Sequence, residues 1–362
     1  MRRPGRVVVT GVGVVNAAVR GGGATLGTWL ARPRAAALTG AGGGVARLEP
    51  GGLASLIDPT EARRLSHACQ LTIAAARLAL AESGYDPARG LGLVLGTEFG
   101  DLTSTLEFAD GYLQRGPIGL SPLLFPNTVM NTMVATCAIA VGARELALTL
   151  NAASVAGELA VARGAAAVAS GRVPAVLAGG VDEVAPLVER ALDDLGTSAQ
   201  ARGEGVTLML LESAESAAAR GASPLGEIIA AAWRALRARP HGIGRRGAPE
   251  AITAALAAAG TAPSDVRWVY GSASGDRARD AWERRLLDAA LAPARPPATS
   301  LATLLGHHAG TGALGVAAAA WTARSGLLPT AAGDTARVPP GRGLVHGVAR
   351  GGGHVALVVD AA

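Results

Sequence analysis

The sequence predicts an α/β protein made of two similar halves, and three observations support this prediction. Short apolar runs typical of strands alternate with alanine-rich segments typical of helices. The runs are continuously apolar, as expected for strands whose sheet is covered by helices on both faces. The alternation restarts after a loop near residues 220–224, and 362 residues with 49% hydrophobic composition suffice for a large core. We therefore expect an N-terminal half at residues 1–220 and a C-terminal half at residues 221–362.

The first half opens with RVVVTGVGVV (residues 6–15), an apolar run that leads into a glycine turn. The preceding basic residues imitate a secretory signal peptide. Thr10, Asn16 and two glycines interrupt the apolar part, however, which favours a buried strand and a cytoplasmic protein. Later strands are expected in LGLVLGT (91–97), ELALTL (145–150) and PAVLAGGVDEV (174–184), and a strand followed by a helix in TLMLLESAESAAARG (207–221).

A lone serine stands at a predicted strand-to-helix turn in LTLNAASVAGELAVARG (148–164). The apolar run turns small and polar at Ser154 and then becomes an Ala/Val-rich helical pattern that begins near Val155. A hydroxyl in this place is typical of a residue that caps a helix N-terminus. Hydrolases present a nucleophilic serine at a similar turn, so both interpretations of Ser154 stay open.

The second half repeats the pattern from residue 224 onward. The Gly- and Pro-rich stretches at residues 40–52, 240–248 and 338–353 are predicted to be loops. Strands are expected in PLGEIIAAAW (224–233), RWVYGSA (267–273) and HVALVVD (354–360), and helices at residues 250–259 and in DRARDAWERRLLDAALA (276–292).

Charge and hydropathy exclude several classes of function. The chain has a net charge of +5, and the densest group in its scattered basic residues is Arg234, Arg237, Arg239, Arg245 and Arg246. We interpret this group as a solvated face or a contact for an acidic protein. The basic stripe with interleaved aromatic residues that indicates nucleic-acid binding is missing from the sequence. No apolar run approaches the roughly 18 residues of a membrane span.

The two cysteines, Cys69 and Cys137, lie in apolar surroundings without a second ligand at metal-binding spacing. We interpret them as buried thiols of a protein in a reducing cytoplasm. Neither a metal site nor a cofactor is expected.

Five segments in a fixed order point to one known family. They are VVVTGVGVVN, GPIGLSPLLFPNTVMNTMVA, SGRVPAVLAGGVDEV, GEGVTLMLLESAESAAARGA and SLATLLGHHAGTGALGVAAA. In this order, they resemble five parts of the β-ketoacyl synthases. These parts are the first strand, the loop and helix leading into the dimer interface, the strand after the nucleophile helix, the end of the first half, and the segment that bears a catalytic histidine. The resemblance runs along nearly the full chain. It implies a thiolase-like five-layer αβαβα sandwich of two similar halves, normally dimeric.

The position of the family's nucleophilic cysteine holds a serine. The family carries this cysteine in a T-A-C-x-S turn, and counting back from the residue that corresponds to Ser170 leads to Ser154. A thiol is readily ionised by a helix N-terminus and nearby imidazoles, so it attacks thioesters at neutral pH. A serine hydroxyl requires a positioned base instead.

Most of the family's other catalytic groups are missing as well. Its HGTGT motif reads YGSASGD here, which places Ser272 at the histidine position, and its lysine corresponds to Ala302. The C-terminal gating loop reads VARGGGHVAL; it keeps Gly352 and Gly353 but has lost its phenylalanine. Of the cysteine and two histidines that decarboxylate and condense, only His307 in LLGHHAG remains.

These departures predict a non-condensing subunit that resembles the chain-length factors of type II polyketide or fatty-acid-type systems. We expect it to form a heterodimer with an active ketosynthase, which supplies the missing groups, and to work with an acyl carrier protein. Residues 122–136 are expected at the subunit interface, where Phe125, Val129, Met130 and Met133 would bound the acyl tunnel. Ordinary core packing explains these apolar residues almost as well.

Two other hypotheses stay open. The first is an acyltransferase or hydrolase acting on acyl thioesters, with Ser154 as nucleophile and His307 as base. The sequence shows no obvious acidic residue to orient that histidine, and Glu158, Asp182 and Asp276 are the candidates. The second is a structural homodimer without catalysis.

Overall fold

A computed structural model describes residues 5–39, 43–194, 200–244 and 248–362 of the chain. Arg245 and Arg246 of the predicted arginine group lie outside the described residues. The first half contains, in chain order, β1 (Val7–Asn16), β2 (Arg20–Gly21), α1 (Gly23–Ala31), β3 (Val45–Ala46), α2 (Pro59–Ala62), α3 (His67–Ser83), β4 (Leu91–Thr97), α4 (Leu102–Arg115), α5 (Thr132–Val141), β5 (Ala147–Asn151), α6 (Ala156–Ala169), β6 (Ala175–Asp182), α7 (Pro186–Asp194), β7 (Arg202–Gly203), β8 (Gly205–Ser213) and α8 (Ala214–Ala219).

The second half begins with a long strand and ends with an antiparallel strand pair. In chain order it contains β9 (Gly226–Ala235), α9 (Glu250–Ala258), β10 (Val269–Tyr270), α10 (Arg277–Leu291), β11 (Ala298–Thr299), α11 (Ala302–Leu305), α12 (Ala309–Ser325), β12 (Leu327–Pro329), β13 (Thr335–Arg337), β14 (Gly343–Val348) and β15 (Gly353–Asp360).

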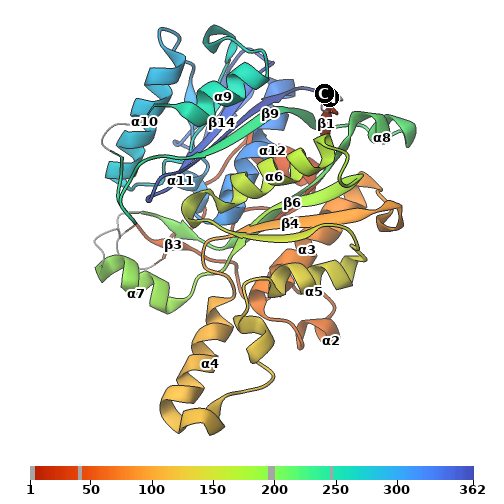
Figure 1. The fold of residues 1–362 in the computed structure, drawn as a ribbon, viewed down its shortest axis with the longest axis vertical. Coiled ribbons are helices and arrows are strands. Elements are labelled where there is room, and N and C mark those ends of the chain that lie inside the picture. Colours follow the sequence, from red (N-terminus) through yellow and green to blue (C-terminus); the bar gives the residue numbers. More distant parts are fainter. Residues whose placement is uncertain (1–4, 40–42, 195–199, 245–247) are drawn as a thin grey trace.

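An 11-stranded sheet joins the two halves in the order β11-β10-β14-β15-β9-β1-β8-β6-β4-β5, with β2 beside β1. The halves meet where Val7–Val9 of β1 pair antiparallel with Gly226–Ile228 of β9. First-half strands lie on one side of this contact and second-half strands on the other. In Figure 1 the second-half strands lie above the central helices α6 and α12, and the first-half strands lie below them.

Five layers of secondary structure are stacked from top to bottom in Figure 1. They are α9 with α10, the second-half strands, the central helices α6 and α12, the first-half strands, and α3 with α5. Because both faces of each set of strands are covered, β1, β4 and β6 are buried along their entire lengths. The predicted α/β sandwich of five layers is confirmed.

The central helices cross at very short range. A Cβ atom at Gly157 of α6 would lie 1.9 Å from the carbonyl oxygen of Ala309 at the start of α12. Only glycine at position 157 therefore allows this crossing. The contact brings the turn before α6, which carries Ser154, close to the segment before α12, which carries His307.

Local sequence signals set the ends of other helices. The side chain of Ser66 accepts a hydrogen bond from the N–H of Cys69 and so caps the start of α3, which ends at Gly84 with φ of 61°. Gly326 ends α12 with φ of 64°. These left-handed positions favour glycine, which has no Cβ atom.

Most predicted elements agree with the structure, and three do not. The predicted loop at 338–353 contains β14, a fully buried strand, and the loop at 40–52 contains the two-residue strand β3. The predicted strand at 267–273 shrinks to β10 at Val269–Tyr270. Glycine-rich composition misled the first prediction, because Gly343 and Gly347 lie inside β14, where neighbouring side chains leave no room for a Cβ atom. Across the described ranges, no helix combines the length and apolar character that crossing a membrane requires.

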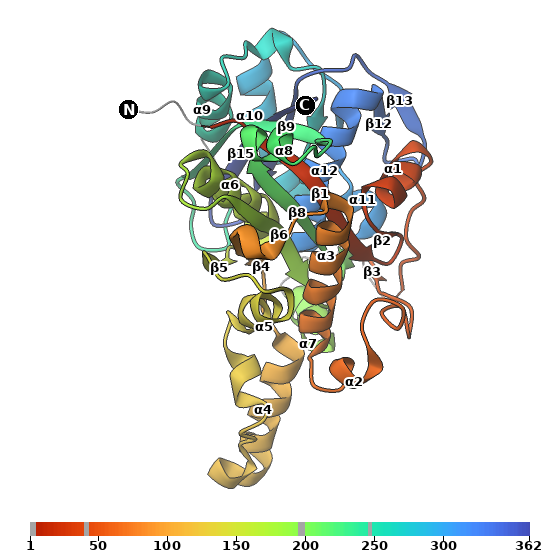
Figure 2. The same ribbon diagram turned by 90° about the vertical axis from the view of Figure 1, so that its right-hand side faces the viewer.

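An arm projects from the five layers in both Figure 1 and Figure 2. We define the arm as residues 102–131, which comprise α4, the 3-10 turns Gly116–Gly119 and Phe125–Thr128, and the chain leading into α5. Phe108 and Phe125 connect its two sides, with ring centroids 6.0 Å apart. Several apolar side chains of the arm are exposed, including Ile118 at 90% and Leu123 at 88%. The arm is therefore a surface feature with an unusual amount of apolar area.

Two glycine substitutions in the central helices test the importance of the crossing. Gly157→Ala should destabilise the protein by about 1–3 kcal/mol, because the added methyl group meets backbone that cannot move independently. Gly315→Ala in α12 is the matched control. Its Cβ atom would be 3.8 Å from its nearest neighbour, so it should be neutral or stabilise by up to about 1 kcal/mol through helix propensity. Urea unfolding of both variants measures the difference, and equal effects would contradict the close crossing.

Candidate functional site

Ser154 lies in the turn between β5 and α6. Residues Ala153–Val155 form a single 3-10 turn, and α6 begins at Ala156, so the predicted strand-to-helix turn is confirmed. The serine is buried, but its side chain makes no capping hydrogen bond, and the residue at the N-cap position of α6 is Val155. The interpretation of Ser154 as a helix cap is therefore wrong.

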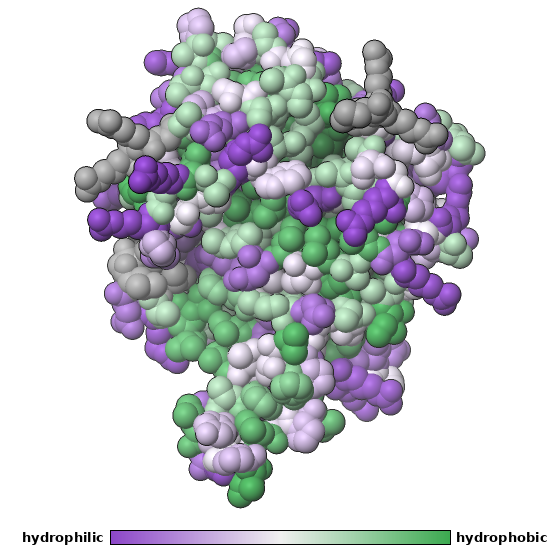
Figure 3. All heavy atoms as spheres, viewed as in Figure 1, coloured by the Kyte–Doolittle hydropathy of each residue, from purple (hydrophilic) through white to green (hydrophobic). Residues whose placement is uncertain are grey.

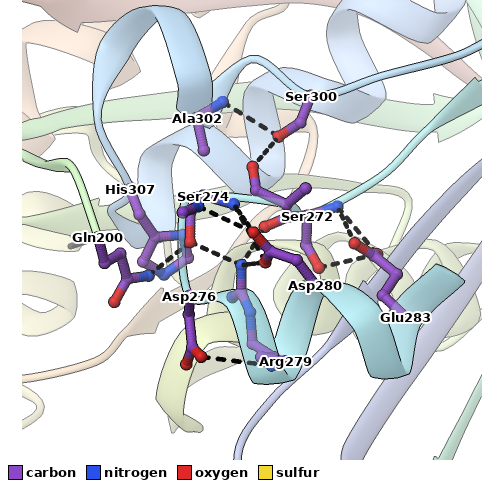
Figure 4. A network of polar contacts seen from close by, with 12 residues as sticks. Gln200, Ser272, Ser274, Asp276, Arg279, Asp280, Glu283, Ser300, Ala302 and His307 are labelled. Atoms are coloured by element: carbon purple, nitrogen blue, oxygen red, sulfur yellow. Dashed lines mark hydrogen bonds and ion pairs between the residues drawn. The ribbon is translucent and has the colours of Figure 1, made fainter. Parts of the chain in front are cut away.

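Ser272 heads a buried chain of hydrogen bonds. It follows β10, and Glu283 of α10 accepts hydrogen bonds from its N–H at 2.9 Å and from its hydroxyl at 2.8 Å. Nδ1 of His346 on β14 lies 2.9 Å from the same carboxylate, and its Nε2 lies 2.7 Å from Nε2 of His354 on β15. Figure 4 shows the Ser272 side chain directed at Glu283. The proton of this hydroxyl is therefore already committed to a carboxylate.

The surroundings of Glu283 and His354 shift the pKa values of these two members of the hydrogen-bond chain. Burial alone would raise the pKa of Glu283, but the hydrogen bond with His346 and the charges of His346 and Arg279 bring it below its ordinary value. Burial lowers the pKa of His354 to about 3. A carboxylate with a lowered pKa is a weak base, so Glu283 orients the Ser272 hydroxyl without removing its proton.

His307 lies between α11 and α12 and is buried. Its Nε2 atom has no hydrogen-bond partner and lies 3.7 Å from Oε2 of Glu98, a carboxylate oxygen that accepts a hydrogen bond from Arg202 at 2.8 Å. Burial, and next the charge of Arg202, lowers the pKa of His307 well below its ordinary value. The imidazole is therefore neutral at physiological pH.

Glu98, at the end of β4, is the carboxylate that faces His307, and sequence analysis missed it. Asp182 instead accepts a hydrogen bond at 2.7 Å from the first backbone N–H of α12. Asp276 pairs with Arg350 at 2.8 Å. Neither of these two candidates orients the histidine, because each is committed to a different partner.

Ser272 and His307 line one small cavity at the centre of the protein. Its volume is about 20 Å³, which suffices for one water molecule. Glu158, the third acidic candidate, also lines this cavity from α6, and Ser154 is not one of the described residues around it. The structure thus brings together two of the three predicted site residues and adds an acid.

Two family models match the chain across most of its length. The Beta-ketoacyl synthase, N-terminal domain, matches residues 52–217, and the Beta-ketoacyl synthase, C-terminal domain, matches residues 231–333. The chain belongs to the β-ketoacyl synthase family. The two matches follow one another in the order that the family's two halves take.

Curated relatives of this β-ketoacyl synthase chain are distant. A 3-oxoacyl-(acyl-carrier-protein) synthase 2 of Synechocystis is 28% identical over 65% of this chain and 63% of the relative. A tetracenomycin polyketide synthase ketoacyl synthase alpha subunit of Streptomyces glaucescens is 27% identical over 76% of this chain and 73% of the relative. The matched part of the chain thus spans about six tenths of the length of the Synechocystis protein.

Solved structures show the same fold. The ishigamide ketosynthase/chain length factor superimposes with a TM-score of 0.90 and 22% identity, over 99% of this chain and 100% of that chain. A ketosynthase in complex with its type II polyketide synthase acyl carrier protein superimposes with a TM-score of 0.86 and 19% identity, over 99% and 100%. This β-ketoacyl synthase chain therefore has the fold of type II ketosynthases and chain length factors.

The described part of this β-ketoacyl synthase chain offers little replacement chemistry for the family's cysteine. Cys69 and Cys137 are free and buried, and burial raises the pKa of the Cys137 thiol to about 12. Within the same residues no group of three or more His, Cys, Asp or Glu side chains is suited to hold a metal ion. What the site retains is a neutral imidazole, several hydroxyls and the buried acid Glu158.

The residues predicted to line a tunnel divide into two groups. Phe125, Val129 and Met130 belong to the arm and are exposed, Phe125 at 59%. Met133 is 1% exposed and packs in the core beneath β4 with residues of α3. Its burial favours core packing, the competing explanation, over the expected place in the tunnel or interface.

Burial of the Glu158 side chain costs an unusual amount of free energy for a core residue. Its side chain is 3% exposed, and its Oε2 atom has no hydrogen-bond partner. Burial, with a smaller effect of Glu283, raises the pKa of Glu158 to about 7. The sequence indicated Glu158 as a candidate acid near His307, but it gave no sign that the carboxyl group is buried without a partner.

Glu158→Gln should make the protein less sensitive to rising pH. In the unfolded chain the carboxyl group ionises near pH 4.5, whereas in the folded chain it stays protonated until about pH 7. The wild-type protein therefore loses stability between these values, by about 2–3 kcal/mol from pH 5 to pH 8. Glutamine cannot ionise, so the variant should gain on the wild type by that amount, measured by urea unfolding. The exposed Glu215→Gln is the control, and a constant difference across pH would contradict the raised pKa.

Proposed function

We propose that this chain is a non-condensing, chain-length-factor-type subunit that pairs with an active ketosynthase in polyketide or fatty-acid-like biosynthesis. The observation that carries the proposal is the state of its own site. Serines occupy the nucleophile and histidine positions, and the hydroxyl of Ser272 is bound to a carboxylate. The remaining histidine is neutral and buried. Such a site has no thiolate, and among the described residues His307 is the one imidazole on the cavity wall for decarboxylation and condensation.

The arm supports a partner subunit. Figure 3 shows apolar residues on the projecting arm, at the bottom of the view. Most of the large exposed apolar side chains of the described residues belong to the arm, and Ile139 of α5 lies close behind it in the chain. Apolar patches of this kind on a soluble surface mark contacts with another protein. An area rich in Leu, Ile, Phe and Met fits an obligate partner, because it is costly to leave in water.

The edge strand β5 supports the same conclusion. It pairs with β4 on one side, and within the described residues it has no strand on the other. Its three central residues are half-buried, and the residues at its two ends are exposed. An open edge is normally paired, covered or blocked by charge. A strand of the ketosynthase partner would complete the sheet beside Ser154.

The tunnel and carrier-protein roles extend this proposal. Phe125, Val129 and Met130 are the arm residues we assign to the tunnel wall, because their apolar side chains suit a hydrocarbon chain. The carrier protein would deliver the chain to the active subunit. The fold shared with a ketosynthase that binds an acyl carrier protein supports this arrangement.

A Ser154-dependent acyltransferase or hydrolase is the second candidate. The observation in its favour is Glu98, because a carboxylate beside His307 is what a serine–histidine–acid arrangement needs. Against it, the 3.7 Å separation exceeds a hydrogen bond, and Glu98 is already paired with Arg202. The non-condensing subunit therefore remains our proposal.

Charged substitutions on the arm test the heterodimer. Ile118→Glu and Leu123→Glu place a carboxylate in an apolar contact and should weaken binding to a candidate ketosynthase partner by at least about tenfold. Leu38→Glu, at an exposed apolar residue outside the arm, is the control. Co-expression followed by quantitative pull-down measures binding, and the condensation assay should be positive only for the complex. Condensation by the isolated wild-type chain would refute the proposal.

Ser154→Ala separates the two candidate functions. In a non-condensing subunit it should leave the product of the complex unchanged and alter stability by no more than about 1 kcal/mol, because Ser154 makes no capping hydrogen bond. In a serine acyltransferase the same change should reduce the rate by several orders of magnitude. Mass spectrometry after incubation with an acyl thioester gives the direct reading. An acyl group on Ser154 would support the second candidate.

A further inference from the structure

The cavity beside Ser272 and His307 has two wall groups without hydrogen-bond partners, the carboxyl of Glu158 and the imidazole of His307. The hydroxyl groups on its wall are used within the protein. Ser272 donates to Glu283 at 2.8 Å, Ser300 donates to the carbonyl of Ala273 at 2.6 Å, and Thr311 donates to the carbonyl of Gly306 at 2.9 Å. Oε2 of Glu158 and Nε2 of His307 are the wall atoms that lack a hydrogen-bond partner, and the carboxylic acid is the stronger donor of these two groups.

The surroundings of Glu158 keep this acid in place. Cβ atoms at Gly312 of α12 and Gly347 of β14 would lie 2.1 Å and 2.9 Å from its carboxyl oxygens, so these two glycines leave the space that the carboxyl group fills. Because α6, α12 and β14 enclose the group, its side chain has little freedom to turn toward solvent. The carboxyl is therefore held on the cavity wall.

Burial favours the neutral form of Glu158, and the charges around it act in both directions. Glu283 and Arg279, both on α10, are the charged groups that act on it, with opposite signs, and His307 on the cavity wall is neutral. With the four wall hydroxyls committed elsewhere, including that of Tyr270, which pairs with Thr322 at 2.8 Å, an ionised Glu158 finds no donor among them. A neutral carboxylic acid in an apolar setting is an effective hydrogen-bond donor.

We propose that this cavity binds one neutral oxygen acceptor, held by a hydrogen bond from the carboxylic acid of Glu158. Two sources share this chemistry, a water molecule and the carbonyl oxygen of an acyl thioester. The volume of about 20 Å³ suffices for a single oxygen atom. The site uses residues of this chain alone, so it does not depend on the partner subunit proposed above.

Crystal structures of three forms test the binding site. In wild-type protein at pH 6 an ordered oxygen should lie within hydrogen-bond distance of Glu158. Glu158→Gln keeps a donor and should keep this density, whereas Glu158→Leu should lose it. The surface change Glu215→Leu is the control and should leave it unchanged. Should the leucine variant fail to fold, Glu158→Met takes its place.

Infrared spectroscopy distinguishes the two sources. A short acyl pantetheine labelled with ¹³C at its carbonyl is added to each form, and the carbonyl band is followed. A band shift in the wild type and Glu158→Gln that is lost in Glu158→Leu identifies the thioester carbonyl. Ordered oxygen in the crystals without a band shift identifies water.

Two results would overturn the inference. One is a wild-type cavity with neither ordered density nor a band shift, and the other is density that persists in Glu158→Leu. Binding of each variant to the ketosynthase is measured in parallel. A variant that loses the cavity ligand but still binds the ketosynthase bears on this inference alone. A variant that keeps the ligand but no longer binds the ketosynthase bears on the proposed function alone.

Discussion

The two central helices cross so closely that backbone touches backbone, and the rest of the molecule is arranged around that contact. Gly157 of α6 lies against the carbonyl of Ala309 in α12. Each helix also covers the inner face of a set of strands. Both helices are rich in small side chains because α6 and α12 lie so close to one another. This explains why so large a core contains so few aromatic residues. It also places the turn with Ser154 and the segment with His307 near one another.

Several polar groups lie at the centre of the protein near this crossing. Some of them have hydrogen-bond partners there, and others have none. The hydrogen-bond chain from Ser272 through Glu283 and His346 to His354 satisfies most of its members. Glu158 and His307 have no such partners and stay neutral by burial. A site of this kind orients groups but holds no strong nucleophile, in keeping with a subunit that shapes a reaction carried out elsewhere.

The arm contrasts with this tightly packed centre. Its apolar side chains, Phe125 and Met130 among them, have no core to enter because α4 extends away from the layers. Only one or two turns further along, the chain returns to the body, and Met133 is fully buried. One apolar segment therefore has exposed side chains at its N-terminal end and buried side chains at its C-terminal end. The change occurs where α5 begins.

The sequence by itself determined the α/β class, the order of most elements and the turn at Ser154, because these depend on local patterns and on motif order. It also predicts serines at the positions of the family's cysteine and of one histidine. It missed β14, where glycines inside a strand imitate a loop, and it placed Met133 with the arm. The tertiary structure alone decided which groups meet: Glu98 with His307, Glu283 with Ser272, and Glu158 with the cavity. These partners are brought together by sheet order and helix crossing across 11 to more than 200 positions of the chain. No periodicity or spacing records such contacts, so only the folded chain reveals them.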